Sequence, residues 1–230
     1  MARVELVVAR YNESLAWLRK VPPEIERTIF NKNPQEPYPD SIQLPNLGRE
    51  AHTYVQHIIE RFDNLADITV FCQGHPFDHA FDFHTSLRQI AQNPTSINDF
   101  RWLGHIIDTD DARGHTLFRG WSKNADGREL DLGGFHKSLF GTVGPTHYTF
   151  VLGAQFAVTR QQIRTRPLDF WQRALELSLH FPDAAHCFER TWDKVMGVQG
   201  INREWLAGRT TVYLKPIKRL QAPTETSTED

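Results

Sequence analysis

The chain lacks the features of a membrane or secreted protein. No apolar run approaches the ~20 residues that a transmembrane helix needs. The start, MARVELVVARYNE, acquires acidic and polar residues too early for a secretory signal peptide. The two cysteines, Cys72 and Cys187, both stand in hydrophobic surroundings, which favours a reducing compartment over a disulfide framework. We therefore expect a cytoplasmic protein with no membrane segment.

The sequence also lacks an excess of charge of either sign. Its 26 basic and 28 acidic side chains give a net charge of −2, which implies no broad basic face, so no nucleic-acid partner is expected. Neither an internal repeat nor a linker divides the 230 residues. We expect a single domain over residues 1–219. Residues 220–230, rich in Pro, Thr, Ser and acid, are expected to form a disordered tail.

Several well-known catalytic and cofactor motifs are missing. The chain has no Gly-x-Ser-x-Gly elbow, no P-loop, no Gly-x-Gly-x-x-Gly after its first strand, and no Cys-x-x-Cys. Eleven histidines and six tryptophans are many for this length. They are compatible with a polar-aromatic pocket or with an ordinary scatter through core and surface.

The first half of the chain has the pattern of an α/β fold. Short β-branched segments alternate with helical ones, and the predicted strands are Val4–Ala9, Arg27–Asn31 and Asp67–Phe71. Asn12 is the expected N-cap of a helix carrying Leu15 and Leu18, and Glu50–Phe62 is the clearest amphipathic helix. This order predicts a mainly parallel sheet flanked by helices, with right-handed crossovers.

The second half is less regular. Its predicted strands are Tyr148–Leu152, Gln155–Val158 and Thr211–Leu214. Helices are expected over Pro167–Phe181, with Leu168, Trp171, Leu175 and Leu179 buried, and over Ala184–Met196, with Phe188, Trp192 and Val195 buried. Asp108-Thr109-Asp110-Asp111 matches a metal-binding Asp-x-Asp superficially, but it has the polar character of a surface turn before Gly114.

In an open parallel sheet, ligands bind at the carboxyl ends of the strands, near a point where the strand order reverses. Three segments follow the predicted strands in this way, and we expect them to converge in space. They are Arg10-Tyr11-Asn12-Glu13, Asn46-Leu47-Gly48-Arg49-Glu50 and Gln73-Gly74-His75-Pro76-Phe77-Asp78-His79.

The second of these segments precedes the clearest helix. A helix N-terminus favours an anion, and Arg49 can add a contact to phosphate or carboxylate. The same residues are also typical of a plain cap, in which Asn46 closes the loop and Gly48 takes a positive φ.

The third segment holds three candidate ligands for a divalent metal, His75, Asp78 and His79. Pro76 favours a turn there rather than a helix, so substrate hydrogen bonding or a structural turn is the alternative. Glu189-Arg190 is either a solvated ion pair or a carboxylate and guanidinium presented to the cleft.

Five segments resemble the family known as domain of unknown function 3431. The resemblance spans about Val4 to Trp192, and its most specific part is the spacing from Asn46-x-Gly48-Arg49-Glu50 to Gln73-Gly74. The segments are VVARYNESLAWL, PNLGREAHTYVQHII, TVFCQGHPFDH, VLGAQFAVTRQQIRTRPLDFW and FERTW. The family label implies no activity.

A wider resemblance is to GT-A glycosyltransferases, which have a Rossmann-like first half and use nucleotide-sugar donors. Asn12-Glu13 is similar to the end of their first strand, and Asn46–Glu50 resembles an Asn-x-Gly-Arg-Asp motif of some rhamnan-type transferases. Gly153-Ala154-Gln155-Phe156, with Arg160, and Glu189-Arg190-x-Trp192 resemble the acceptor half. Where GT-A enzymes usually carry Asp-x-Asp, this chain has Gln73-Gly74-His75, which lacks the carboxylate pair that Mg²⁺ or Mn²⁺ prefers.

The resemblance implies a GT-A-like transferase that moves a group, a sugar first of all, from a nucleotide-activated donor to a hydroxyl acceptor. The implied catalytic carboxylates are Asp78, Glu189 and Glu13, and the implied acceptor-binding residues are His79, Gln155 and Arg190. The implied donor-binding residues are Arg10, Asn12, Asn46, Gly48, Arg49, Glu50 and Gln73. The implied metal ligands are His75, Asp78 and His79, which would hold Mn²⁺ or Mg²⁺ if a metal cofactor is used. The alternatives are a transferase that uses an aminoacyl or acyl donor, and a non-catalytic module that binds a glycan or metabolite.

Overall fold

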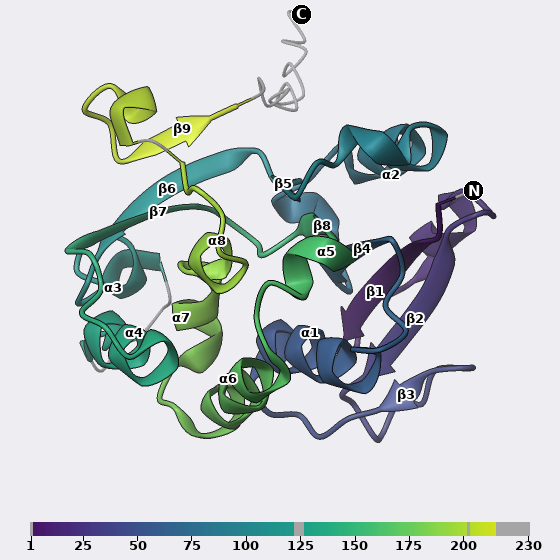
Figure 1. Ribbon diagram of the computed structural model, residues 1–230, viewed down its shortest axis with the longest axis horizontal. Helices are drawn as coiled ribbons and strands as arrows, with labels where there is room; N and C mark the ends of the chain where they lie inside the picture. The colour runs from purple at the N-terminus through teal and green to yellow at the C-terminus, as the bar shows by residue number, and fades with distance from the viewer. Residues whose placement is uncertain (1, 122–126, 202, 215–230) are drawn as a thin grey trace, which may run out of the picture.

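The first strand, β1 (Val4–Arg10), is buried along its whole length and lies inside a six-stranded sheet. The computed structural model describes residues 2–121, 127–201 and 203–214 (Figure 1). The strand order is β3-β2-β1-β4-β8-β5. The other strands of this sheet are β2 (Glu26–Asn31), β3 (Ile42–Gln43), β4 (Ile68–Gln73), β5 (Phe100–Trp102) and β8 (Phe156–Thr159).

Four neighbouring strands of the sheet are parallel, and β8 runs antiparallel between β4 and β5. The predicted α/β class with a mainly parallel sheet is confirmed. The chain proceeds from β1 outward to β2 and β3, then returns to place β4 on the other side of β1. The strand order therefore reverses between β1 and β4, which is the position where open α/β sheets bind ligands.

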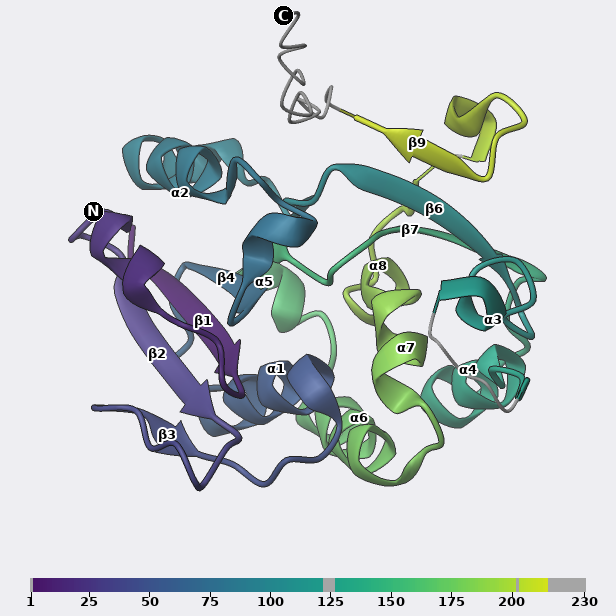
Figure 2. The ribbon, with the colours of Figure 1, turned by 180° about the vertical axis from the view of Figure 1, so that it is seen from behind.

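Both faces of the sheet are covered because successive strand residues point to opposite sides. Leu6 and Val8 pack with one buried cluster, whereas Val7 and Ala9 pack with the other. The first cluster includes the 3₁₀ helix η1 (Ala16–Lys20) and α2 (Phe83–Gln92). The second includes α1 (Arg49–Glu60), α6 (Leu168–His180) and α7 (Ala184–Glu189), which lie together on the same side in Figures 1 and 2.

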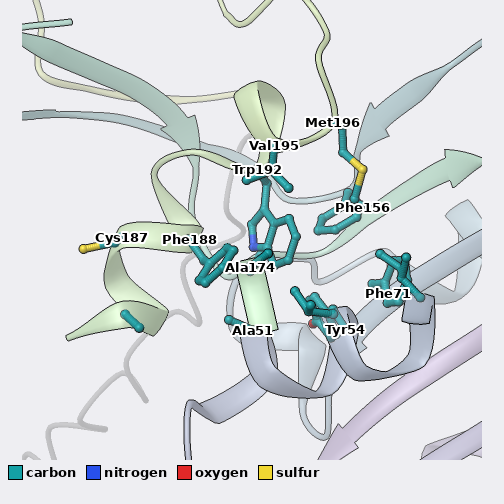
Figure 3. Close-up of a cluster of buried hydrophobic side chains, with 14 of the residues drawn as sticks. Ala51, Tyr54, Phe71, Phe156, Ala174, Cys187, Phe188, Trp192, Val195 and Met196 are labelled. Carbon is teal, nitrogen blue, oxygen red and sulfur yellow. The ribbon is translucent and has the colours of Figure 1, made fainter. Parts of the chain in front are cut away.

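The larger cluster is built on aromatic side chains from distant parts of the chain. Trp192 is fully buried, and its ring contacts those of Tyr54, Phe156 and Phe188 at centroid separations of 5.6, 5.0 and 5.2 Å. Figure 3 shows Trp192 between the α1 side chains and those of α7. These contacts fix α7 against α1 and so bring their polar residues to one end of the sheet.

A second, three-stranded sheet has the order β7-β6-β9. It is formed by β6 (Ile106–Asp111), β7 (His147–Val151) and β9 (Thr211–Tyr213), all antiparallel. The expected surface turn at Asp108–Asp111 is wrong. These residues end a strand in which Asp108 and Asp110 are buried, because each carboxylate accepts several hydrogen bonds.

Three further expectations about helices are corrected. Asn12 caps no helix: the segment after β1 forms only η1, and its N-cap is Leu15. The helix expected over Ala184–Met196 is two, α7 and α8 (Trp192–Val195), because the chain turns at Arg190 and Thr191. In α6, Trp171 is buried as predicted, but Leu168 is 38% exposed and Leu175 and Leu179 are only partly buried. The buried face is therefore rotated toward Phe170, Ala174 and Ser178.

The remaining elements are short connections. They are η2 (Pro76–Asp78), η3 (Pro94–Ser96), α3 (Phe118–Trp121), α4 (Leu132–Phe140), α5 (Arg160–Ile163) and η4 (Arg203–Leu206). Among the described residues, no helix has both the length and the apolar character to cross a bilayer. The tail predicted over residues 220–230 lies outside the described residues.

Candidate functional site

The strands next to the reversal point end at the same level. Arg10 pairs with Asn31 across β1 and β2, and Ala9 pairs with Gln73 across β1 and β4. A pocket of about 630 Å³ lies at this edge. Its lining includes residues from all three segments that follow predicted strands, together with residues of α7. The predicted convergence of the strand ends is therefore confirmed, and the chemical roles of the residues stay predictions.

Arg10 lies at the end of β1, and its guanidinium is hydrogen-bonded mainly to other groups of the protein. Its Nη1 donates to Asn31 Oδ1 at 2.7 Å and to the carbonyl of Glu36 at 3.0 Å, while its Nε donates to the carbonyl of Glu13 at 3.1 Å. The guanidinium also lies over the Tyr38 ring, 5.3 Å from its centroid. Arg10 lines the pocket, but these bonds show that it also ties the loops after β1 and β2 together.

Glu13 lines the pocket, whereas Asn12 is exposed and lies outside the lining formed by the described residues. Glu13 Oε2 accepts a hydrogen bond from the backbone N–H of Tyr11 at 2.7 Å. A Cβ at Gly74 would lie 2.6 Å from the same oxygen. The absence of a side chain at Gly74 therefore lets the loops after β1 and β4 approach each other at the pocket.

Lys32, which follows β2, fastens the loop that leads into α1. Its Nζ donates to the carbonyls of Leu47 and Pro45 and lies 3.0 Å from His52 Nδ1. Burial lowers the pKa of Lys32 to about 8, against the opposing effect of Glu50. Burial and the charge of Lys32 lower the pKa of His52 to about 4, so His52 is neutral and its Nδ1 accepts.

Gly48 is the N-cap of α1 and has a left-handed backbone, with φ of 61°. A Cβ at this position would overlap the backbone oxygen of Ser178 in α6, so only glycine fits both the conformation and the helix contact. The positive φ expected of Gly48 is confirmed. Gly48 does not itself belong to the pocket lining among the described residues, but Asn46 and Arg49 on either side of it do.

Arg49 is an exposed cation at the N-terminus of α1 and lines the pocket. Its Nη1 lies 3.4 Å from Nε2 of His186 in α7. Because a guanidinium can only donate, Nε2 accepts and the proton of a neutral His186 is on Nδ1. Burial lowers the pKa of His186, against the charge of Glu189. The Arg49 guanidinium thus donates to a neutral His186 on another helix of the pocket lining.

Glu50 and Glu189 are two carboxylates of the same pocket. Glu189 Oε1 accepts the backbone N–H of Gly153 at 2.7 Å, and its Oε2 lies 3.6 Å from Arg190 Nη1. Burial and the charge of Glu189 raise the pKa of Glu50 to about 7, although its own backbone N–H and the Gln73 side chain bond to it. The pocket therefore contains a carboxyl group that changes charge near neutral pH.

The three proposed metal ligands do not assemble. His75 Nε2 and Asp78 Oδ1 are 3.6 Å apart on an exposed rim, where the side chains are 53% and 75% exposed. No group of three His, Cys, Asp or Glu side chains within the described residues has the arrangement of a metal site. His75, Asp78 and His79 all line the pocket, but in this arrangement they do not fit a three-ligand metal centre.

His79 and Glu189 both lie close to Gly153, whose backbone has a φ of 91°. A Cβ at Gly153 would lie 2.6 Å from His79 Cβ and would overlap Gln155 Oε1. Gln155 is fully buried and is not part of the described lining of the pocket. Neither its amide atoms nor His79 Nδ1 have a hydrogen-bond partner among the described residues.

Arg190 lines the pocket but is only 2% exposed. Its Nε and Nη2 donate to Asp110 Oδ2 at 2.9 and 2.8 Å, and its Nη1 donates to the carbonyl of His186 at 3.0 Å. The expected alternative of a solvated Glu189-Arg190 pair is wrong, because Arg190 is buried against a strand of the second sheet.

Lys32, His186, Leu117 and Phe118 line the pocket and were missed in the sequence. Lys32 directly follows a predicted strand, so the rule used for the other strand ends could have found it. His186 is one helical turn before Glu189-Arg190, a spacing that could have linked it to them. Nothing local distinguishes Leu117 and Phe118 from core residues.

Comparison with known proteins extends these observations. The sequence model of the family described as protein of unknown function (DUF3431) matches residues 6–103, which confirms the predicted resemblance over that part of the chain. The curated proteins gave no match. A solved structure of CMP:2-keto-3-deoxy-manno-octonic acid synthetase complexed with CTP is similar, with a TM-score of 0.39 and 13% identity, over 87% of this chain and 89% of that chain.

Proposed function

We propose that this protein is a transferase that moves a group, a sugar first of all, from a nucleotide-activated donor to a hydroxyl acceptor. The observation that carries the proposal is the pocket at the reversal point of the sheet, whose lining combines Arg49 and Glu50 from the N-terminus of α1 with Glu189 from α7. A transfer of this type needs a cationic region for the leaving phosphate and a carboxylate for the acceptor proton.

The donor phosphate is assigned to the beginning of α1. Within the described residues no preceding side chain caps this 12-residue helix, and among backbone N–H groups the Glu50 carboxylate bonds only its own, so the other N–H groups of the first turn are assigned to the anion. Arg49 adds an exposed guanidinium, which bonds phosphate oxygens in pairs. Asn46 lines the pocket next to them and supplies an amide. This role for Arg49 and Asn46 keeps the donor-binding prediction made from the sequence.

The acceptor is assigned to the side formed by α7 and the turn around Gly153. Glu189 and His79 present polar groups there, and Leu152 and Phe118 add an apolar wall. Arg190 supports this side through its bond to Asp110 rather than by direct contact with solvent. We assign no reaction step to a metal ion, since the rim residues His75 and Asp78 do not complete a ligand set.

The test is calorimetric titration with nucleoside diphosphates and inorganic pyrophosphate, each with and without Mg²⁺. We expect a nucleoside diphosphate to bind, and Arg49→Ala to weaken it by about 10- to 100-fold, since a hydrogen bond to a charged group contributes roughly 1.5–3 kcal/mol. Arg88→Ala, an exposed arginine of α2 on the other face of the sheet, is the matched control.

The outcomes separate the alternatives. Equal affinity for pyrophosphate and for the nucleotide would indicate that the pocket recognises the phosphates and not the nucleoside. Unchanged nucleotide binding in Arg49→Ala would refute the assignment of the donor phosphate to α1. If no nucleotide binds, the proposal fails, and a donor of the aminoacyl or acyl class or a binding role without catalysis takes its place.

A further inference from the structure

A second pocket, of about 450 Å³, lies among residues of α4, α6 and α8. Figures 1 and 2 both show α4 beside α6, and the two helices pack against each other. The described lining of this second pocket shares no residue with that of the first pocket. The proposed transfer therefore makes no use of it, although its volume is in the range of small-molecule sites.

The polar lining of the second pocket is basic. It includes Arg166, Arg173, Lys194 and His136, and no acidic side chain belongs to the described lining. Lys194 is already neutralised, because its Nζ donates to Asp193 Oδ2 at 2.9 Å. Neither arginine forms an ion pair with a described residue. Two positive charges therefore remain at the pocket without a counter-charge from the described residues.

Arg166 is held in a fixed orientation. Its Nε donates to the carbonyl of Val195 at 3.1 Å, and its Nη2 donates to the carbonyl of Lys194 at 2.8 Å. The guanidinium carbon also lies 4.8 Å from the ring centroid of Phe170 and 5.8 Å from that of Phe140. Since Nε and Nη2 share one edge of the guanidinium, the two N–H groups of Nη1 and the second one of Nη2 form a fork with no bond to a described residue. A fork of this kind binds two oxygens of one anion.

Arg173 lies near this fork on the same helix face. It follows Phe170 by three positions on α6, a spacing that makes the two side chains neighbours on the helix surface. Arg173 is exposed, and no hydrogen bond or ion pair joins it to a described residue. Its guanidinium is therefore available to an anion that Arg166 binds.

The second pocket also has an apolar wall. Leu139 and Phe140 of α4 and Phe170 of α6 belong to the lining, and the two phenyl rings lie 5.9 Å apart between centroids. An inorganic ion bound to the arginines would leave this wall in contact with water. A ligand with an apolar body would cover it, and the hydrophobic effect would add to its affinity.

We propose that the second pocket binds a small phosphate monoester, with its phosphate on Arg166 and Arg173 and its apolar body against Phe140 and Phe170. A phosphate monoester has a charge of about −1.5 to −2 at pH 7, which matches the two positive charges that remain, whereas a carboxylate would neutralise only one. The inference goes beyond the proposed function, because neither the residues nor the ligand are those of the first pocket.

The first test is calorimetric titration with phenyl phosphate, inorganic phosphate and benzoate. It uses Arg49→Ala protein, in which the first pocket has lost its exposed cation. We expect phenyl phosphate to bind at least about tenfold more tightly than inorganic phosphate, because part of its ring is buried, and more tightly than benzoate. Introducing Arg173→Gln should weaken phenyl phosphate by about 10- to 100-fold, the usual effect of losing a hydrogen bond from a charged group.

The matched control is Lys137→Gln. Lys137 is exposed on α4 next to His136 but lies outside the described lining, so its replacement removes one nearby positive charge without touching the pocket. We expect it to change the affinity by no more than about twofold, since salt screens an exposed charge outside the site. Equal weakening by Lys137→Gln and Arg173→Gln would indicate general attraction by the surface charge and would refute the site.

A second measurement locates the ligand. In ¹⁵N-labelled protein, phenyl phosphate should shift the backbone N–H signals of Thr142 and Lys194, which line the second pocket, and leave that of Asn46 in the first pocket unmoved. Arg166→Lys should weaken binding by about tenfold although it retains the charge, because lysine has no fork. If this variant does not fold, Arg173→Gln decides, since no bond to a described residue depends on Arg173.

The outcomes distinguish this inference from the proposed function. Shifts confined to Asn46, or equal affinity for phenyl phosphate and inorganic phosphate, would overturn the inference and leave the proposed function standing. Equal affinity for benzoate and phenyl phosphate would refute the match of charge. If phenyl phosphate binds the second pocket but no nucleotide binds the protein, the inference stands and the proposed function fails.

Discussion

The buried pair of Asp110 and Arg190 gives the largest stability prediction. Their side chains are 0% and 2% exposed, and two guanidinium nitrogens donate to Asp110 Oδ2 at 2.9 and 2.8 Å. The backbone N–H groups of Leu117 and Phe118 also donate to Asp110. Replacing Asp110 by Asn keeps the shape and one acceptor oxygen but leaves the buried guanidinium with only Glu189, 3.6 Å from its Nη1, as counter-charge.

Removing one partner of a buried ion pair typically costs about 3–5 kcal/mol. For a chain of this size that corresponds to a Tm lower by on the order of 10 °C. We expect Asp110→Asn to show this loss in urea unfolding and in calorimetry. Glu129→Gln is the control, since it removes an exposed pair with Arg113 and should lower the free energy of unfolding far less than Asp110→Asn does. Equal effects of the two substitutions would refute the reasoning.

Two further predictions concern stability. Gly48→Ala should destabilise the protein by about 2 kcal/mol or more, because a left-handed backbone costs a residue with a side chain about 1–2 kcal/mol and the new Cβ would overlap Ser178. Urea unfolding measures the loss. Gly141→Ala is the control, because Gly141 is also left-handed but has open space around it, so the difference between the two variants gives the cost of the overlap. Burial raises the pKa of Glu5, but His57 and Thr28 outweigh it and the pKa lies below 4.5. The stabilisation lost in Glu5→Gln should therefore be constant above about pH 5 and shrink as pH falls through the lowered pKa, and a pH-independent difference would contradict it.

The first half of the fold was predictable because its elements are locally self-consistent. The β1 segment is a short run of β-branched and apolar residues, and α1 carries its apolar side chains at helical spacing. Their order alone indicates a parallel sheet. The rule that ligands bind at the carboxyl ends of strands then located the pocket from the sequence, because it depends on topology and not on side-chain detail.

The second half was not predictable in the same way because its burial depends on distant partners. The β6 sequence IIDTDD is polar, and it forms a buried strand because groups elsewhere in the fold bond its carboxylates, among them Arg190, 80 positions from Asp110. Similarly, the expected helix over Ala184–Met196 breaks where Arg190 turns toward that aspartate. A local pattern contains no information on such a pair.

Within the site, the sequence identified residue types at strand ends but not their roles. It predicted Glu50 as a donor-binding residue, which stays a prediction, but it could not show that burial and the charge of Glu189 raise the pKa of Glu50 to about 7. The position of Lys32 after a predicted strand could have been found by the strand-end rule, but its bonds to the carbonyls of the loop before α1 could not. Both features arise from tertiary contacts between α1, α7 and the β2 end.

The charges of the pocket divide into two groups by their bonding. Arg10, Lys32 and Arg190 donate mainly to carbonyls or to a buried carboxylate, so the protein requires them for its own loops and strands. Arg49 is exposed and bonds only a neutral histidine among the described residues, and burial and the charge of Glu189 raise the pKa of Glu50 to about 7. Groups with unsatisfied interactions gain most from a ligand, because binding adds bonds that folding has not supplied. The chemistry of the pocket is therefore expected to depend on Arg49 and Glu50, and the other cations to shape the space around them.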